Sequence, residues 1–198
     1  MNGKITALGL WEQAWDLILT SAGQAHRPFG TPAVGNAGSD GLPRQRTVVL
    51  RRADKAAATL THYTDRRSVK AKELIGNPVF SYLFWDGDHR IQFSGHGPTR
   101  WSTKAEARDI FAALPKHGRR AYATILPPST SMATGGSGLP PDWEERTLPE
   151  TDYALDNFGV LVTRLVYADV LLLDREGNRR LTAIRDASDH WQLRWIVP

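Results

Sequence analysis

The stretch HYTDRRSVKAKELIGNP (62–78) joins an apolar alternating segment to a short helix. Hydroxyl-bearing and cationic side chains crowd this junction: Tyr63, Thr64, Arg66, Arg67, Ser68 and Lys70. The start of a helix offers free backbone N–H groups and a partial positive charge, and both favour a phosphate or another anion. A capped surface helix with solvated cations is the commoner arrangement for such a stretch taken alone. The junction becomes a candidate site only together with the features that flank it.

Outward from the junction, the sequence alternates strand patterns with a few helical ones. An amphipathic helix is predicted over 8–22, and the capping-box residues Thr103 and Glu106 open another at about 103–114. Pro, Gly, Ser and Thr dominate 127–152, which is predicted to be a long irregular loop. The other predicted elements are a strand near 29–35, a turn at 39–42, strands over 46–52 and 57–63, a helix over 68–76, a hairpin of 79–85 and 89–97, and strands over 158–174, 179–185 and 191–197.

Strands outnumber helices in this order, and the close hairpins imply antiparallel pairing. A regular βαβ alternation is missing, which argues against a doubly wound sheet. The predicted fold is therefore mainly β (α+β), an antiparallel barrel with a few flanking helices. A chain of 198 residues fits one domain, so a single domain over 1–198 is expected.

Composition excludes several classes of function. The net charge is only +4 and no basic block occurs, so a small anion is expected as a ligand rather than nucleic acid. No cysteine is present, which excludes disulfides and thiolate catalysis, and the six histidines lack metal-ligand spacing. Glu12 and Asp16 interrupt the apolar N-terminal segment, and no apolar run approaches the roughly 20 residues of a membrane span. We expect a cytoplasmic protein with no metal and no membrane partner.

Two further signals lie on the predicted strands. Arg46 and Arg51 flank an apolar strand, so they do not both point into one core. Arg90 and Gln92 fall two residues apart on one face of another strand, where planar donor groups suit the edge of a heterocycle. Each signal taken alone is also explained by a solvated strand.

The order and spacing of these pieces resemble the pyridoxamine 5′-phosphate oxidase-like flavoproteins, the FMN-binding split β-barrels. The resemblance covers about 29–114 well and 158–198 more loosely, where Trp191 and the closing WIVP resemble the end of the family pattern. The motifs that carry it are Arg46-Thr47-Val48-Val49-Leu50-Arg51, Tyr63-Thr64, Ser68-Val69-Lys70, Asn77-Pro78 and Arg90-Ile91-Gln92-Phe93-Ser94-Gly95.

This resemblance implies FMN as the cofactor and a homodimer with FMN at the subunit interface. The phosphate would be held by Arg46, Ser68 and Lys70, and the flavin edge would meet either Arg90 or Gln92. Backbone groups of 48–50 would line the flavin ring. The implied set of FMN-contacting residues is Arg46, Thr47, Val48, Val49, Leu50, Tyr63, Thr64, Ser68, Lys70, Arg90, Gln92 and Arg180.

The substrate side departs from the family pattern. Val69 replaces an expected arginine, for which Arg66 or Arg67 could substitute, and Arg51 replaces the lysine that helps hold the substrate phosphate. The remaining substrate-phosphate residues of the family are missing around 109–118. We therefore expect an FMN-dependent oxidoreductase that acts on a small molecule other than pyridoxamine 5′-phosphate.

Two alternatives stay open at this point. One is a relative that uses a deazaflavin or haem, for which His62, His89 or His96 would be the candidate haem ligands. The other is a non-catalytic flavin-binding or stress-associated protein. The colour of the purified protein would separate flavin from haem.

Overall fold

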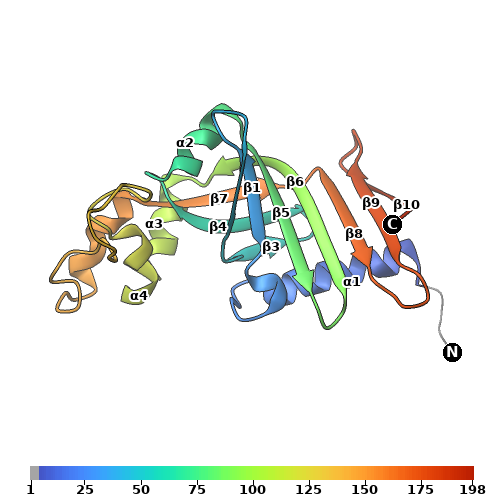
Figure 1. Cartoon of the computed structure of the whole chain (residues 1–198), viewed down its shortest axis with the longest axis horizontal. Coiled ribbons are helices and arrows are strands. Elements are labelled where there is room, and N and C mark those ends of the chain that lie inside the picture. Colours follow the sequence, from blue (N-terminus) through green and yellow to red (C-terminus); the bar gives the residue numbers. More distant parts are fainter. Residues whose placement is uncertain (1–4) are drawn as a thin grey trace.

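The computed structural model describes residues 5–198, and its strands form one antiparallel sheet system that curls over without closing (Figure 1). The sheet order is β10-β9-β8-β6-β5-β1-β2, while β4 joins β3 to β7 and β7 returns to the end of β6. The predicted antiparallel split barrel is therefore confirmed. Its strands are β1 (Ala33–Ala37), β2 (Pro43–Thr47), β3 (Arg52–Asp54), β4 (Thr59–Asp65), β5 (Val79–Asp86), β6 (Ile91–Trp101), β7 (Phe158–Arg164), β8 (Tyr167–Leu172), β9 (Arg179–Arg185) and β10 (Trp191–Ile196).

The long strand β6 belongs to both parts of the sheet system. Residues 91–96 pair with β8, whereas 99–101 pair with β7. At the crossing, a Cβ on Gly97 would lie 1.9 Å from the carbonyl oxygen of Arg164. Only glycine permits this close approach of two backbones, so the bend of the barrel depends on it.

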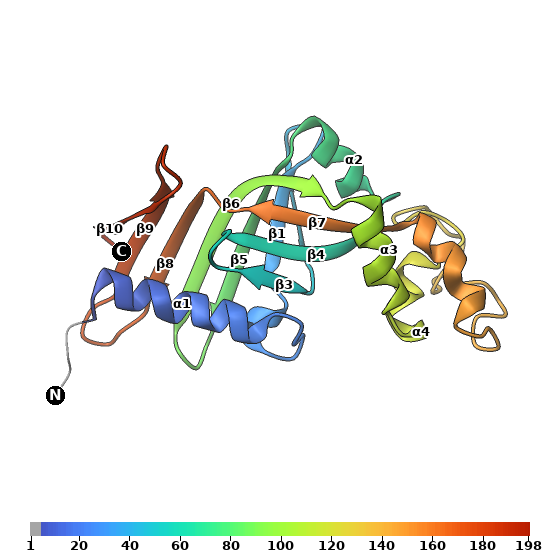
Figure 2. The ribbon, with the colours of Figure 1, turned by 180° about the vertical axis from the view of Figure 1, so that it is seen from behind.

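The first helix, α1 (Ala7–Ser21), covers one face of the sheet (Figure 2). The Thr6 side chain caps it by accepting a hydrogen bond from the Gly9 amide at 3.0 Å. Its apolar stripe is fully or almost fully buried: Leu10, Trp11, Ala14, Trp15 and Ile18. This stripe supplies much of the barrel core, as the helical spacing predicts. No helix among residues 5–198 is long and apolar enough to cross a membrane.

One predicted strand is divided in the structure. The sequence predicts 46–52 as one strand, but β2 ends at Thr47 and β3 begins at Arg52. Between them, the amides of Val48 and Leu50 donate to the carbonyls of Pro32 and Gly30 at 3.1 and 2.9 Å. The chain thus crosses from β1 to β4 over 48–51 instead of continuing a ladder, which local β-propensity does not reveal.

The predicted strand over 158–174 is likewise two strands, β7 and β8, with a corner at 165–166. The helices α2 (Val69–Gly76) and α3 (Lys104–Ala112) lie where they are predicted, and α3 has the predicted capping box of Thr103 and Glu106. The elements that the sequence did not predict are α4 (Lys116–Arg119) and the 3₁₀ turns η1 (Pro28–Gly30), η2 (Arg120–Tyr122) and η3 (Pro149–Asp156).

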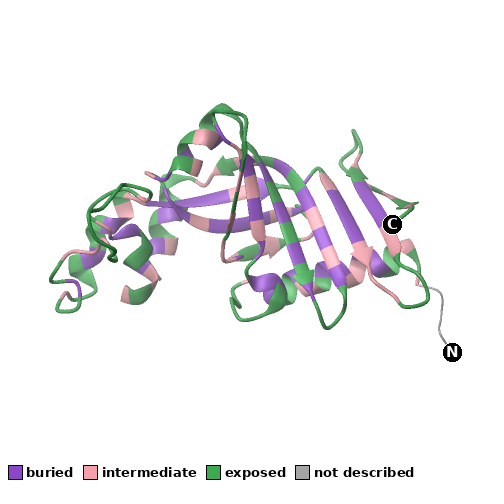
Figure 3. Cartoon of the chain, in the orientation of Figure 1, coloured by how far each residue is buried: buried purple, intermediate pink, exposed green. Residues whose placement is uncertain are grey.

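Residues 104–156 form a helical lobe at one end of the molecule, with an apolar cluster separate from the barrel core (Figure 3). The 127–152 loop is part of this lobe, and its end is bound to Arg119 of α4. Arg119 is 3% exposed and donates to Asp152 at 2.6 Å, to Thr151 at 3.0 Å and to the Leu148 carbonyl at 3.1 Å. A buried cation with these partners stabilises the end of the loop.

Candidate functional site

A cavity of about 310 Å³ opens where the 47–49 segment, β4, the start of α2 and the helical lobe meet. We call it the junction pocket, since the sequence stretch 62–78 builds one side of it. Its lining residues are Thr47, Val48, Val49, Arg51, Tyr63, Thr64, Asp65, Ser68, Lys70, Ala121, Tyr122 and Pro128.

The start of α2 forms one wall of the pocket. Ser68 is the N-cap residue, and its hydroxyl donates to the Asp65 carbonyl at 2.7 Å instead of capping a helix amide. The first amides of the helix therefore have no side-chain cap from Ser68. Ser68 and Lys70 line the pocket at the start of the helix, where the helix dipole favours an anion.

Lys70 brings a full positive charge to the same wall. Burial, together with repulsion from Arg46, lowers the pKa of Lys70 to about 8. Asp65 acts in the opposite direction, but its carboxylate is bound to Arg67 at 2.7 Å. A partly buried ammonium group without a close counter-ion is stabilised by a bound anion.

The 47–49 segment offers backbone groups to the pocket. The amides of Val48 and Leu50 point away, toward the Pro32 and Gly30 carbonyls. In extended backbone successive amides point to opposite sides, so the Val49 amide lies on the pocket side. Leu50 itself is fully buried in the barrel core and contributes no side chain to the pocket.

The opposite wall is aromatic and carries Arg51. The Arg51 guanidinium lies 5.0 Å from the centre of the Tyr63 ring. Tyr122, from the helical lobe, is 5% exposed, and burial raises its pKa to about 12. The pocket thus combines a cationic, hydroxyl-rich end with an aromatic end, which suits a flat ligand that carries an anionic tail.

Arg46 lies near Lys70 at the helix-start wall, but it does not line the pocket. Its guanidinium donates to the Asn36 side chain, and Asn36 donates in turn to Glu73 at 2.8 Å. Burial lowers the pKa of Arg46, while the nearby Glu73 raises it. Arg46 therefore contributes charge near Lys70, and its hydrogen bonds go to β1 and α2.

Besides Arg46 and Leu50, three more predicted contacts lie outside the junction pocket. Arg90 is exposed in the β5–β6 turn with φ of +54°, and Gln92 and Arg180 lie on the outer face of the sheet. Gln92 pairs with Leu171, and Leu171 pairs with Arg180, so the two polar residues share that face. Arg180 is held there by Asp169 at 2.9 Å. None of these three residues lines the junction pocket.

Neither cation suggested as a substitute at position 69 reaches the pocket. Arg67 is bound to Asp65, and its other nitrogen donates to the Thr124 carbonyl at 3.1 Å. Arg66 turns the other way and lies 4.4 Å from the centre of the Trp101 ring. Lys70 is thus the cation that lines the helix-start wall of the pocket.

The three candidate haem ligands are also elsewhere. His62 is fully buried in the barrel, with its ring stacked on Phe80 and Nδ1 3.0 Å from the Tyr82 hydroxyl. Burial lowers the pKa of His62 to about 3, so it is neutral. His89 is bound to Asp86, and His96 stacks on Tyr167 at the outer face.

Sequence reasoning missed the residues that the helical lobe supplies, namely Ala121, Tyr122 and Pro128, and it missed Asp65. Asp65 lies inside the stretch 62–78, where a carboxylate between cations was a usable signal. No sequence pattern points to the lobe residues, because tertiary packing alone brings them to the pocket.

Comparison with known proteins relates the sequence that builds most of this pocket to a protein family. Residues 11–102 match the family model of the pyridoxamine 5′-phosphate oxidase FMN-binding domain. The match covers β1 to β6 and α2, which build most of the junction pocket. These residues are therefore similar to the FMN-binding domain of the pyridoxamine 5′-phosphate oxidase family. The cofactor of the matched domain is FMN.

Curated proteins with similar sequences carry the name of the same oxidase. The chain is 33% identical over 107 residues to a pyridoxine/pyridoxamine 5′-phosphate oxidase of Nitrobacter winogradskyi, covering 54% of this chain and 48% of the relative. It is 27% identical over 122 residues to the Deinococcus deserti oxidase of the same name, covering 61% and 55%. The chain thus spans about half the length of the curated relatives it matches.

Solved structures extend the likeness of fold to nearly the whole chain. An FMN-binding protein related to pyridoxamine 5′-phosphate oxidase from Nostoc punctiforme superposes with a TM-score of 0.76 at 20% identity, covering 95% of this chain and 97% of that one. PhzG of Burkholderia lata, solved with tetrahydrophenazine-1-carboxylic acid, gives a TM-score of 0.71 at 14% identity, with coverages of 100% and 95%. At these identities the likeness shows the oxidase-like split-barrel fold alone.

The residues of the junction pocket fit FMN. A phosphate at the start of α2 would meet Lys70 and free amides, and it would offset the burial that lowers the pKa of Lys70. The backbone of 47–49 and the aromatic end formed by Tyr63 and Tyr122 leave a slot for a planar ring. Riboflavin would leave the cationic end unpaired.

Proposed function

We propose that this chain binds FMN in the junction pocket and acts as a flavin-dependent oxidoreductase on a small molecule. The observation that carries the proposal is Lys70, a partly buried ammonium group beside the uncapped start of α2. When bound, FMN would supply the electron-accepting chemistry. The protein residues hold the phosphate, place the ring on 47–49 and limit the access of water.

A homodimer belongs to this proposal. The outer face of the sheet exposes apolar side chains beside Gln92 and Arg180, among them Leu83 at 43%, Trp85 at 46% and Ile184 at 53%. Such a patch on a sheet face is typical of a protein interface. A second copy packed on this face would bring its own Gln92 and Arg180 within reach of the junction pocket, as the family resemblance implies.

The substrate is proposed to differ from pyridoxamine 5′-phosphate. A phosphorylated substrate needs a second set of cations near the flavin. Arg119 is committed to the Asp152 and Thr151 partners inside the lobe, and Arg120 reaches toward Glu144 at 4.0 Å. Arg51 is then the one cation on the aromatic side of the pocket lining.

The test is the ligand content and colour of the purified protein. Incubated with equal concentrations of FMN and riboflavin and then dialysed, the protein is expected to retain FMN with a flavin absorbance spectrum. Equal retention of both compounds would contradict the assignment of Lys70. A Soret band instead of a flavin spectrum would favour the haem-binding alternative, and FMN that no electron donor reduces would favour the non-catalytic one.

A further inference from the structure

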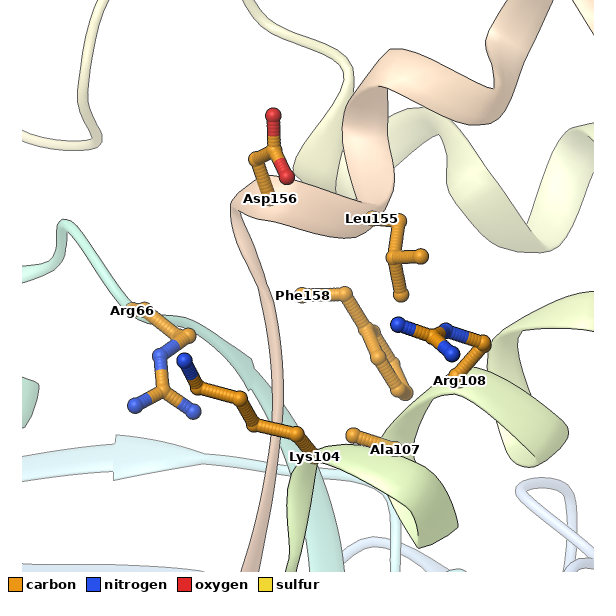
Figure 4. A pocket seen from close by; sticks show the side chains of 7 residues that line it. All are labelled: Arg66, Lys104, Ala107, Arg108, Leu155, Asp156 and Phe158. Carbon is orange, nitrogen blue, oxygen red and sulfur yellow. The ribbon is translucent and has the colours of Figure 1, made fainter.

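A second cavity, of about 480 Å³, shares no lining residue with the junction pocket (Figure 4). We call it the cationic pocket. Its lining residues are Arg66, Lys104, Ala107, Arg108, Leu155, Asp156 and Phe158. Three cations and one acid surround an apolar floor, so the lining has a net charge of +2.

The three cations have no counter-ion of their own. None of Arg66, Lys104 and Arg108 forms an ion pair within 4.0 Å with any acid among residues 5–198. In Figure 4, Lys104 points toward Arg66, whereas the Asp156 carboxylate points away from the three cations. The nearest acid of the lining therefore leaves the positive charge unpaired.

The three cations are solvent-exposed, and their placement at one rim is mildly unfavourable in an empty protein, because water and salt screen the repulsion only in part. Lys104 and Arg108 are four residues apart on α3, so two like charges face each other on one side of the helix. Lys104 is also the first residue of α3, where the helix dipole disfavours a cation. Arg66 adds a third positive charge from the β4–α2 junction, and an anion between them would relieve all three repulsions.

Arg66 is held in place by a cation–π contact with Trp101. Its guanidinium lies 4.4 Å from the centre of the Trp101 ring. A Cβ on Gly159 would lie 2.4 Å from the Trp101 ring and 2.8 Å from the Arg66 side chain. The absence of a side chain at Gly159 thus lets both groups lie against β7, and it fixes the guanidinium at the rim of the pocket.

The floor of the pocket adds a preference for the body of the ligand. Phe158 and Ala107 are only 1% and 6% exposed, whereas Leu155 is half-buried, so Leu155 offers most of the accessible apolar surface beneath the cations. The volume is in the range of sites for small ligands. We propose that the cationic pocket binds a small aromatic anion, whose ring lies over the apolar floor at Leu155 and whose phosphate or carboxylate group lies between Arg66, Lys104 and Arg108.

The experiment is calorimetric titration of FMN-saturated protein with phenyl phosphate, benzoate, inorganic phosphate and benzyl alcohol. Phenyl phosphate is expected to bind best, because three cations favour a dianion and the floor favours a ring. A Lys104→Gln/Arg108→Gln variant is expected to lose at least about tenfold in affinity, since each charge-assisted hydrogen bond contributes substantially. Arg175→Gln, which removes an exposed cation at the β8–β9 turn, is the matched control and should change nothing.

Lys70→Gln separates this pocket from the junction pocket. The cationic pocket predicts that Lys70→Gln retains the affinity for phenyl phosphate, with or without added FMN. Loss of binding in Lys70→Gln but not in Lys104→Gln/Arg108→Gln would place the anion in the junction pocket and overturn the proposal. Equal binding of benzyl alcohol and phenyl phosphate, or no binding of any probe at millimolar concentration, would overturn it as well. If the protein did not bind FMN at all, the phenyl phosphate affinities of the two variants could still be compared, because they do not depend on FMN.

Discussion

The carboxylate of Asp65 holds the side chain of Arg67, accepting hydrogen bonds from its Nη2 at 2.7 Å and its Nε at 3.1 Å. The same carboxylate accepts the Arg67 amide at 2.7 Å, so the turn before α2 is closed by one acid. This pairing turns Arg67 away from the junction pocket and leaves Lys70 as the cation of the helix start. It also keeps the Asp65 charge from neutralising Lys70.

Replacement of Lys70 by methionine is expected to weaken FMN binding by about 10- to 100-fold, the range for loss of a hydrogen bond to a charged group. Riboflavin binding should change little, because riboflavin has no phosphate. Fluorescence titration with both flavins measures the difference. Lys72→Met, an exposed lysine two residues further along α2, is the control. An equal loss for FMN and riboflavin would contradict the role of Lys70.

The pH dependence of Lys70 should appear in stability. The pKa of Lys70 is lowered from 10.5 to about 8 in the folded protein, so between these values the unfolded chain binds more protons. The cost of burying the charge is fully present below pH 8 and disappears as the pH rises toward 10.5. The free energy of unfolding of the FMN-free protein should therefore rise over this interval relative to Lys70→Met. Bound FMN should suppress the rise, since phosphate favours the charged lysine, and affinity for FMN should fall above pH 8.

Ile184→Glu should dissociate the proposed dimer. Ile184 is 53% exposed on the outer face, and a glutamate buried there by a second copy would lack a partner. Light scattering should then give the mass of one chain, and FMN binding should weaken. Ile75→Glu, at a residue 79% exposed on α2, is the matched control. A monomeric parent protein that still binds FMN tightly would contradict the role of the outer face.

Pyridoxamine 5′-phosphate should be a poor substrate. Anaerobic mixing of the FMN-loaded protein with this compound should bleach the flavin slowly or not at all, because Arg119 is enclosed in the lobe and unavailable for a second phosphate. Photoreduction should bleach the same sample normally and serves as the control. Fast, saturable bleaching at micromolar substrate would show that the substrate proposal is wrong.

Gly97→Ala should destabilise the barrel by more than about 3 kcal/mol, at the upper end of overpacking substitutions. The added methyl would lie 1.9 Å from the Arg164 carbonyl oxygen, and backbone cannot move aside as a flexible side chain can. Chemical denaturation monitored by tryptophan fluorescence measures the loss. Gly76→Ala, where a methyl meets nothing within 4 Å, should have a small effect.

The sequence predicts the barrel and one side of the junction pocket because both are encoded locally. Tyr63, Thr64, Ser68 and Lys70 lie within eight consecutive residues, and all of them line the pocket. The break of the strand at 48–51 escapes such reasoning, since hydrogen bonds to Pro32 and Gly30 cause it rather than the residues of the segment.

The other side of the pocket escapes prediction for a related reason. Tyr122 reaches the pocket from the helical lobe, and the packing of that lobe on Phe158 has no periodic signal in the sequence. The roles of Arg90, Gln92 and Arg180 depend on a second copy of the chain, and they stay predictions.

The separate apolar cluster of the helical lobe has a consequence for the kinetics of ligand entry. The lobe can open as a cooperative unit of its own while the barrel core, sealed by α1, stays intact. Opening would move Tyr122 away from the rest of the pocket lining and so speed the exchange of a ligand. Amides of 116–123 should then exchange hydrogen faster than those of β5 and β6, and a bound flavin should slow them selectively. The lobe would then control the rates of ligand entry and release, whereas the residues of the barrel would determine the binding affinity.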